Sequence, residues 1–541
     1  MKKLPAGIQT FETIIDDDYL YIDKTKYLVD LIENGQIYFL ARPRRFGKSL
    51  TITTLDAMFS GKKELFKGLY AEKWMNREDY QSYPVIRLSL NKVTTDSGID
   101  AVKSSIVELL ANTALDLGIE LSRSDMPGML LNELIINVYR KYNKKVVVLV
   151  DEYDKPYIDF VDDHEMAEKV RMSLANLYVQ IKANDEYLRF VFMTGISKFA
   201  RLGVFSKLNN MEDISLNKRY TGICGITREE LLVNFPDYIE LTAENLKITT
   251  RELVDKMEIY YDGFSFDGES KFYNPFSTLL FFKGGGSFEN FWFDSGTSQM
   301  MATYIKNNNF TVEQFHNLQV SRDFVRNPGE MDCTPPEGFL YQNGFLSLRE
   351  GITDDFSLDY PNKEVLDTLS RLTTQNLFER TDQSWSLCLS DFQRALLDGN
   401  TEKFVDVLNR LLAIIPHADF DAAARQNINN NGYKITTQEW LYRSTILAFF
   451  QGCGLLVFGE MQSNKGRSDL ILNQKGRIWI IEIKVAYKDE DVKAKAEEAY
   501  TQIFEKNYNA PYLNAVCIGL AIDDEKREIT EYKTNVEIET K

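Results

Sequence analysis

The sequence predicts an α/β fold that starts with a mostly parallel β-sheet. Within the first 200 residues, short apolar stretches alternate with helical patterns, and strands are expected at 36–41, 83–90, 146–150 and 188–194. Strands separated by helices indicate βαβ crossovers, which pair strands in parallel. The stretch 146–150, VVVLV, is apolar throughout and rich in β-branched residues, which is typical of a strand buried on both faces.

The pattern changes twice further along the chain. Between about 225 and 385, helical segments precede an aromatic-rich stretch, YYDGFSFDGESKFYNPFSTLLFF, so a helical or mixed middle domain is expected. From residue 389, helices lead into several strands, which is an α+β order. Because 541 residues are too many for one core, we expect three domains, at 1–224, 225–385 and 386–541.

Composition excludes several classes of protein. The 44% apolar and 26% charged residues are those of a folded protein, and no apolar run approaches the roughly 18 residues that span a bilayer. We therefore expect a cytoplasmic protein without membrane association. Five scattered cysteines without a C-x-x-C pair, and three scattered histidines, disfavour a disulfide framework, a zinc site and a serine–histidine hydrolase. The net charge of −17 means that a nucleic-acid partner would need a local basic groove.

A strand-to-helix junction near residue 47 carries the elements of a phosphate-binding loop. Gly47, Lys48 and Ser49 offer a lysine for the β- and γ-phosphates, a hydroxyl for Mg²⁺ and the start of a helix aimed at the anion. Where the usual pattern has another glycine, this chain has Arg42. The tripeptide alone is a weak signal, because it also fits an ordinary helix N-terminus.

About 100 residues later an apolar strand ends in two carboxylates, VVVLVDEYD. Asp151 would bind Mg²⁺ and Glu152 would orient or deprotonate the attacking water, as in the Walker B strand of an ATPase. Together the junction and this strand end predict ATP and Mg²⁺ as cofactors. After the next strand, Thr194 or Ser197 could sense the γ-phosphate and Arg201 could stabilise charge. A threonine and an arginine at such positions are more often turn and surface residues.

A second group of charged side chains lies in the C-terminal stretch GRSDLILNQKGRIWIIEIK. If Lys475-Gly476 forms a two-residue turn, Asp469 lies directly opposite Glu482. Lys484 then emerges on the same face as Glu482. Two such carboxylates could share Mg²⁺ beside a lysine, which suits phosphodiester hydrolysis. The alternative is a polar hairpin face, but like charges directly opposite each other favour the metal.

The flanking helices offer two further candidates. Glu439 could add a carboxylate to this site, or it could form a capping box with Thr436, and the two interpretations are even. Gln502 could contact DNA or a metal-bound water, or could simply be exposed.

In combination these motifs resemble the bacterial AAA-ATPase-like proteins that are fused to a PD-(D/E)XK nuclease-type domain. The resemblance covers nearly the whole chain through RPRRFGKS, VLVDEYDKP, FMTGISKF, YNPFS and GRSDL…IEIK…YTQIFEKNY. It implies a P-loop NTPase core, a restriction-endonuclease-like C-terminal domain, and RPRRFGKS as the usual phosphate loop. Arg42, Arg44 and Arg45 would then lie beside the phosphates.

The resemblance also implies roles for the residues of both sites. The ATPase roles fall on Lys48, Ser49, Asp151 and Glu152, and the nuclease roles on Asp469, Glu482 and Lys484. The favoured function is an ATP-hydrolysing protein whose Mg²⁺-dependent nuclease domain acts on nucleic acid, DNA rather than RNA, under nucleotide control. Homo-oligomers are compatible with it. The alternatives are a nucleotide-switched regulatory protein with a non-catalytic nuclease-like domain, and a phosphohydrolase whose C-terminal domain is structural.

Overall fold

A computed structural model describes most of the chain. The described residues are 1–95, 98–160, 163–196, 210–292, 301, 304, 312–326, 336–351, 355–379, 385–414, 437–463, 466–474, 477–512 and 514–536. They form two compact units: Met1–Ser295 with Phe315–Glu364 (the first unit), and Gly296–Gln314 with Val365–Lys541 (the second unit). The three-domain division expected from the sequence stays a prediction.

The first unit is built on a parallel sheet, as predicted, and a short strand at Glu212–Asp213 joins the four strands that the sequence predicts. Its strands are β1 (Ile37–Ala41), β2 (Val85–Ser89), β3 (Val146–Asp151), β4 (Leu188–Gly195) and β5 (Glu212–Asp213). Their order is β2-β3-β4-β1-β5, and every pairing is parallel. Since β4 lies between β1 and β3, the phosphate-loop strand and the acidic strand are both neighbours of β4.

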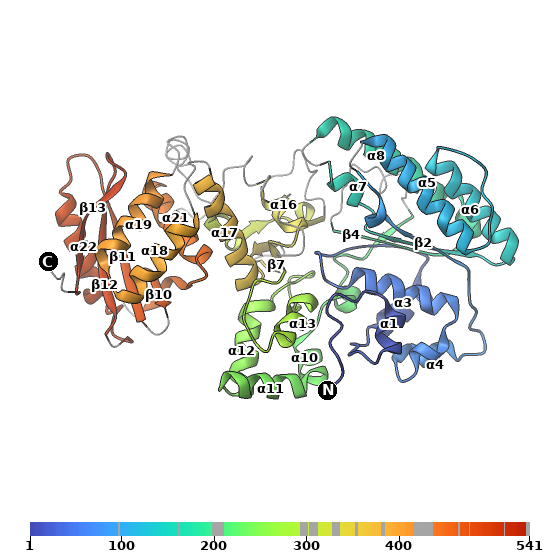
Figure 1. Cartoon of the computed structure of the whole chain (residues 1–541), viewed down its shortest axis with the longest axis horizontal. Coiled ribbons are helices and arrows are strands. Elements are labelled where there is room, and N and C mark those ends of the chain that lie inside the picture. The colour runs from blue at the N-terminus through green and yellow to red at the C-terminus, as the bar shows by residue number, and fades with distance from the viewer. Residues whose placement is uncertain are drawn as a thin grey trace. The chain divides into compact units, whose positions relative to one another are not determined.

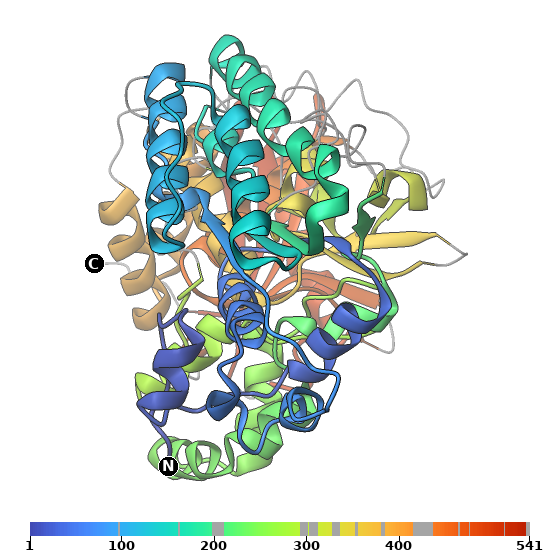
Figure 2. The same ribbon diagram turned by 90° about the vertical axis from the view of Figure 1, so that its right-hand side faces the viewer.

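Helices cover both faces of this sheet. On one face lie α5 (Ile99–Asp116), α6 (Pro127–Tyr142) and α8 (His164–Ala183), and on the other lie α1 (Phe11–Asp16), α3 (Lys48–Ser60) and α4 (Tyr70–Met75) (Figures 1 and 2). Every residue of β3 is buried, because both of its faces meet helices. The carboxyl ends of the strands, where loops emerge, are therefore the place for a ligand site.

Most of the predicted helical or mixed middle region belongs to the first unit, whereas Gly296–Gln314 and the part from Val365 onward belong to the second. The region begins with the helices α10 (Arg228–Asn234), α11 (Pro236–Leu246), α12 (Thr250–Tyr261) and α13 (Pro275–Lys283). Capping boxes start α10 and α12, and the Asn274 side chain caps α13. A small antiparallel sheet follows, in the order β6 (Leu318–Val320), β8 (Phe356–Asp359) and β7 (Ser347–Glu350).

The second unit has the α+β order that the sequence predicts. Helices α17 (Lys363–Glu379, whose first two residues end the first unit), α18 (Trp385–Asp398), α19 (Thr401–Ala413) and α21 (Thr437–Gly452) precede the strands. The strands are β9 (Leu456–Ser463), β10 (Gly466–Gln474), β11 (Arg477–Ala486), β12 (Val516–Asp523) and β13 (Glu528–Thr534), with α22 (Val492–Glu505) between β11 and β12. They form one mixed sheet, β13-β12-β11-β10-β9, in which only β11 and β12 pair in parallel.

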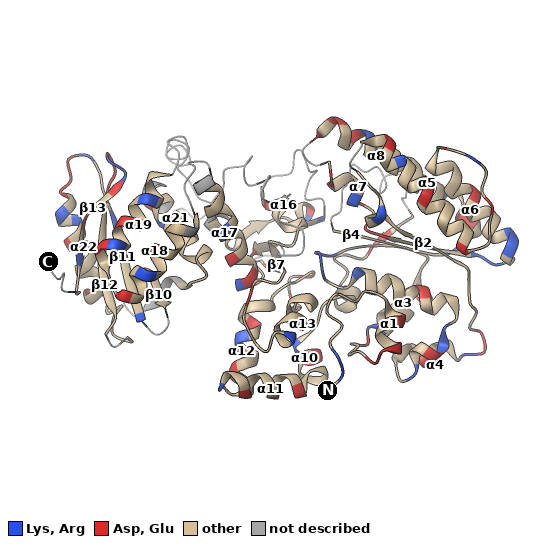
Figure 3. Cartoon of the chain, viewed as in Figure 1, with Lys and Arg blue, Asp and Glu red and all other residues tan. Residues whose placement is uncertain are grey.

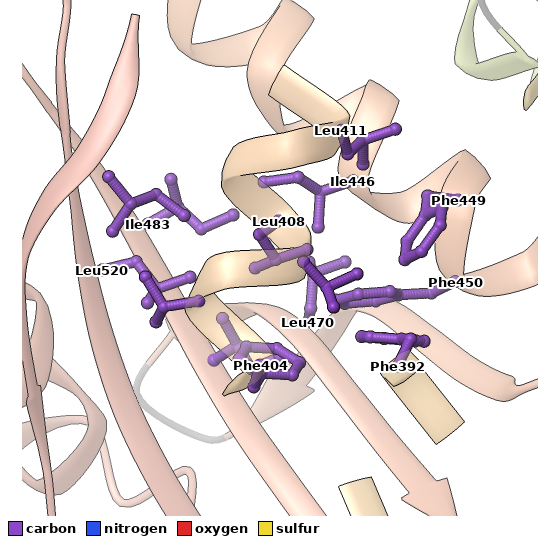
Figure 4. Close-up of a cluster of buried hydrophobic side chains, with 14 of the residues drawn as sticks. Phe392, Phe404, Leu408, Leu411, Ile446, Phe449, Phe450, Leu470, Ile483 and Leu520 are labelled. Atoms are coloured by element: carbon purple, nitrogen blue, oxygen red, sulfur yellow. The ribbon is translucent and has the colours of Figure 1, made fainter. Parts of the chain in front are cut away.

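The core of the second unit lies between this sheet and the helices before it. Figure 4 shows Phe392, Phe404 and Phe450 from the helices packed against Leu470 and Ile483 of the sheet. Alternate residues of β10 and β11 face the other way and pack with Ile503 of α22 in a second, smaller cluster. Asp469 and Glu482 belong to this second face of the sheet.

The surface of both units carries mixed charge. Basic and acidic residues are interspersed along helices such as α8 (Figure 3), and in α8 Lys169 pairs with Glu165 and Arg171 with Glu168. Within the described part of the chain, no helix combines the length and the apolar character that crossing a bilayer requires. The described cysteines, Cys224, Cys388, Cys453 and Cys517, are all buried free thiols.

Candidate functional site

The predicted phosphate loop runs from the end of β1 to the start of α3. Gly47 has φ of 97°, a left-handed conformation that glycine adopts without strain, and it leads directly into Lys48 at the helix start. The Lys48 side chain is 6% exposed, and its Nζ donates hydrogen bonds to the carbonyl oxygens of Arg42 and Pro43, both at 2.9 Å. Burial lowers the pKa of Lys48, whereas the nearby charges of Glu152 and Asp151 raise it.

A hydrogen bond from a threonine hydroxyl of β4 holds the first carboxylate at the end of β3. Asp151 is buried, and the Oγ1 atom of Thr194 in β4 donates to its Oδ1 at 2.8 Å. Glu152 has a left-handed φ of 52°, and burial followed by the charge of Asp151 raises its pKa. A carboxylate with a raised pKa is a stronger base, which suits proton abstraction from water. Ser197, the other sensor candidate, and Arg201, the candidate charge stabiliser, lie outside the described residues.

A cleft of about 310 Å³ opens beside the loop. Its walls combine apolar side chains from the N-terminal segment and α13 with polar groups from the loop and from the end of β3: Ile8, Ile14, Phe276, Lys48, Ser49 and Glu152. This volume falls in the range of small-molecule sites. An apolar wall beside a cationic, hydroxyl-bearing loop suits a ligand with an aromatic part and a phosphate part.

Two arginines of the loop, Arg44 and Arg45, line this cleft. Arg45 has a left-handed φ of 65°, and its guanidinium lies 4.7 Å from the centroid of the Phe276 ring. The backbone of Arg44 is held from the side, because the indole Nε1 of Trp292 donates to its carbonyl oxygen at 3.2 Å. Trp292 is itself anchored by its backbone N–H, which donates to Oε1 of the buried Glu364 at 2.7 Å. Sequence reasoning missed Trp292.

The third arginine corrects a prediction. Arg42 is 1% exposed, and its guanidinium does not face the cleft. Its Nη1 donates to the carbonyl oxygen of Ser215 at 2.9 Å, and its Cζ lies 3.9 Å from the Phe266 ring centroid. The reason is that Arg42 extends strand β1, because its N–H donates a hydrogen bond to the carbonyl oxygen of Gly195 in β4. Its side chain is therefore buried in the protein interior and not directed into the cleft. Only its carbonyl oxygen, the acceptor of Lys48, belongs to the loop.

The C-terminal hairpin has the predicted register. Leu470 pairs with Ile481, and the pairing continues without a shift to Gln474 opposite Arg477. Only two residues join the strands, although that turn itself lies outside the described residues. This register brings Asp469 of β10 and Glu482 of β11 to the same place on the sheet.

Each of the two carboxylates accepts a hydrogen bond from a backbone N–H of the opposite strand. The N–H of Asp469 donates to Oε2 of Glu482 at 3.2 Å, and the N–H of Ile483 donates to Oδ2 of Asp469 at 2.8 Å. Glu482 is 2% exposed, and burial, followed by the charge of Asp469, raises its pKa to about 8. Burial also raises the pKa of Asp469, although the charges of Arg443 and Lys484 oppose this. Without a cation, the pair therefore retains a proton near neutral pH.

The pair fits a divalent cation. Across the described residues, no set of three or more His, Cys, Asp or Glu side chains is arranged to hold a metal. Mg²⁺ does not need such a set, since proteins often hold it through one or two carboxylates with water and phosphate oxygens as the other ligands. A buried and a partly buried carboxylate, both with raised pKa values, are the donors that such a cation would neutralise.

Flanking helices complete this site from two sides. Gln502 of α22 donates from Nε2 to Oε1 of Glu482, so it is not simply exposed. Glu439, in the first turn of α21, is close enough for its charge to raise the pKa of both carboxylates, while Thr436 lies outside the described residues. Arg443 was missed by sequence reasoning. It lies four residues after Glu439, a spacing that places two side chains on one helix face and is the signal that could have found it.

Two family models match the chain, one over each of the sites described above. The model for a predicted AAA-ATPase matches residues 5–205, and the model for the PD-(D/E)XK nuclease superfamily matches residues 437–532. A relative from Azotobacter chroococcum mcd 1, described as an uncharacterized protein in the vnfD 5′ region, is 32% identical over 524 residues. The aligned region covers 94% of this chain and 94% of the relative.

Two solved structures show weaker similarity. The ORC2 protein of Aeropyrum pernix, in ADPNP and ADP complexes, has a TM-score of 0.26 at 10% identity and covers 67% of this chain and 97% of that chain. Cdc6p of Pyrobaculum aerophilum has a TM-score of 0.22 at 11% identity, covering 68% and 98%. Scores of this size carry no argument about function. The chain belongs to the same family as the Azotobacter relative, with a predicted AAA-ATPase domain followed by a PD-(D/E)XK nuclease superfamily domain.

Proposed function

We propose that this protein binds and hydrolyses ATP, and that the nucleotide controls a Mg²⁺-dependent nuclease centre in the second unit. The substrate is nucleic acid, with DNA preferred to RNA. The observation that carries the proposal is the Asp469–Glu482 pair, in which Glu482 is buried and Asp469 partly buried, because two adjacent carboxylates with raised pKa values are costly without a cation to neutralise them. The cleft beside Lys48 supports the ATPase half.

In the ATPase site, each residue has a task that its position supports. Lys48 would exchange its bonds to the loop carbonyls for the β- and γ-phosphates. Ser49 and Asp151 would hold Mg²⁺, which when bound offsets phosphate charge. Thr194 fixes Asp151 through its hydroxyl, and Glu152 would orient the attacking water.

In the nuclease site, Asp469 and Glu482 would hold the divalent cation. When bound, that cation supplies an activated water and offsets the charge that develops on the phosphodiester. Gln502 fixes Glu482 through its amide, and Lys484 lies on the same face of β11 as Glu482. Lys484 would place its ammonium near the scissile phosphate. The charge of −17 over the chain limits nucleic-acid contact to local basic groups such as these.

Plasmid nicking tests the nuclease half. Wild type should nick supercoiled DNA with Mg²⁺ or Mn²⁺, and Asp469→Asn and Lys484→Ala should not. Glu531→Gln, which removes an exposed carboxylate from β13 of the same sheet, serves as the matched control and should cut like wild type. If wild type cuts neither DNA nor RNA, with or without ATP, the protein is a nucleotide-switched binding protein instead.

Nucleotide binding tests the ATPase half. Lys48→Ala should lose ATP binding in isothermal titration calorimetry, whereas Lys67→Ala, which removes an exposed lysine of the same unit, should retain it. Nicking by Lys48→Ala should also stop responding to ATP. A Lys48→Ala protein that binds ATP as tightly as wild type would refute this half of the proposal.

A further inference from the structure

Helix α21 brings a positive charge to the carboxylate pair. Nη1 of Arg443 lies 3.7 Å from Oδ1 of Asp469, and the two side chains are 20% and 16% exposed. Both therefore sit beside the more deeply buried Glu482, where a substrate can reach them. Glu439, one helical turn earlier, contributes a further negative charge to the same place.

The charges around the pair are of two kinds. Asp469, Glu482 and Glu439 are acidic, while Arg443 and Lys484 are the cations that act on Asp469. In the absence of a metal, the Arg443 guanidinium pairs with Oδ1 of Asp469. A divalent cation bound by Asp469 would repel that guanidinium and compete with it for the carboxylate oxygens. Two ligands that compete in this way weaken each other's binding equally.

A guanidinium displaced from Asp469 has an obvious second partner in a nuclease site. Its five N–H donors lie in one rigid plane and match two oxygens of a phosphate group, whereas a lysine offers only a point charge. The scissile phosphodiester must approach the cation held by Asp469 and Glu482. Its non-bridging oxygens would therefore come within reach of Arg443.

We propose that Arg443 is a substrate-binding residue that holds Asp469 in the metal-free site and transfers its guanidinium to a backbone phosphate of the nucleic acid when a divalent cation binds. The inference rests on the proposed nuclease function of the second unit. By this proposal Arg443 lowers the affinity of the site for the metal and raises the affinity for the nucleic acid. An arginine with a purely structural role would change neither affinity.

The first test measures metal binding alone. In calorimetric titration of the full chain with Mn²⁺ and no nucleic acid, Arg443→Gln should bind Mn²⁺ more tightly than wild type, on the order of fivefold or more. Arg443→Lys should lie between the two. Arg410→Gln removes an arginine of α19 that pairs with Asp406 of the same helix and with Asp391 of α18, and it should bind Mn²⁺ as wild type does.

The second test measures phosphate contact without cleavage. A 30-base-pair DNA duplex and an RNA duplex of the same sequence are titrated with protein in Ca²⁺, at several salt concentrations, under conditions in which no cutting is detected. Arg443→Gln should bind more weakly, and the slope of log K against log salt should fall by about 0.9 for duplex DNA, the loss of one phosphate contact. A change with only one of the duplexes identifies the substrate.

The outcomes separate this inference from the function on which it rests. Unchanged Mn²⁺ affinity and an unchanged salt slope in Arg443→Gln would overturn it, whatever happens to stability. Tighter Mn²⁺ binding with a smaller salt slope would support it. Failure of wild type to nick plasmid DNA would instead refute the nuclease proposal, and both titrations can still be read in that case.

Discussion

Replacing Glu482 by glutamine should stabilise the metal-free second unit while it destroys the metal site. The side chain is 2% exposed and accepts hydrogen bonds from the N–H of Asp469 at 3.2 Å and from Gln502. Glutamine has nearly the same shape. Its carbonyl oxygen can accept from Asp469, and its amide can donate to Gln502 once that residue turns its own amide round. The substitution therefore removes a buried charge and keeps both contacts.

The magnitude follows from the pKa of Glu482, which rises from 4.5 to about 8 on folding. Between these values the folded protein keeps a proton that the unfolded chain has released, so stability falls as pH rises from 4.5 to about 8 and is level above. At about 1.36 kcal/mol for each pH unit, the whole fall amounts to about 5 kcal/mol. Since Asp469 shares this proton, Glu482→Gln should recover about 2 to 5 kcal/mol at pH 8.5.

Hydrogen exchange measures this in the second unit alone. Peptides that cover β10 and β11 are followed by mass spectrometry in urea at pH 6 and pH 8.5, with Glu531→Gln as the control. Wild type should be less protected at the higher pH and should gain protection with Mg²⁺, whereas Glu482→Gln should show neither effect. A Glu482→Gln protein that is less stable than wild type at pH 8.5, or that keeps its pH dependence, would show that the buried charge is not the cause.

Three further predictions concern the first unit. Thr194→Val removes the hydroxyl that donates to Asp151, a hydrogen bond to a charged group worth about 1.5–3 kcal/mol. The rate of ATP turnover should therefore fall about tenfold or more, while the ATP affinity measured by calorimetry stays the same. An unchanged turnover rate would contradict the role of Thr194. Trp292→Phe keeps an aromatic side chain but loses the hydrogen bond to the carbonyl oxygen of Arg44, so ATP affinity should fall roughly fivefold. An ATP affinity equal to that of wild type would mean that this hydrogen bond does not shape the loop. Burial raises the pKa of Asp262 to about 6, so stability falls as pH rises from 3.8 to about 6. Asp262→Asn should then be more stable than wild type by about 3 kcal/mol in urea unfolding at pH 8 and equal to it below pH 4.

The register of the C-terminal hairpin shows how far sequence reasoning reaches. Side chains on a strand alternate with a period of two, and a two-residue connection leaves one register open. Counting residues across the turn was therefore enough to place Asp469 against Glu482, as the contact between them confirms. The same reasoning found Lys48 and the strand end at Asp151, because both sit where one kind of element stops and another starts.

Contacts between distant segments were beyond that reasoning. Trp292 and Arg44 are 248 residues apart, and nothing in the local pattern of either stretch refers to the other. Arg443 meets Asp469 only because α21 packs beside the sheet. For Arg42, sequence reasoning predicted the wrong direction of the side chain. Its place in the motif was right, but the motif says nothing about side-chain direction, and the pairing of Arg42 with Gly195 turned its guanidinium away from the cleft.

The sequence by itself determined the first four strands of the parallel sheet, where the carboxylates and the lysine lie along the chain, and which residues pair within one hairpin, because all of these depend on local periodicity and chain length. Only the tertiary structure decided the strand order β2-β3-β4-β1-β5, since helical crossovers of similar length are compatible with several orders of parallel strands. That order sets β4 beside the acidic strand and gives Asp151 its hydroxyl partner, Thr194. Both candidate sites are thus completed by residues that long-range packing supplies.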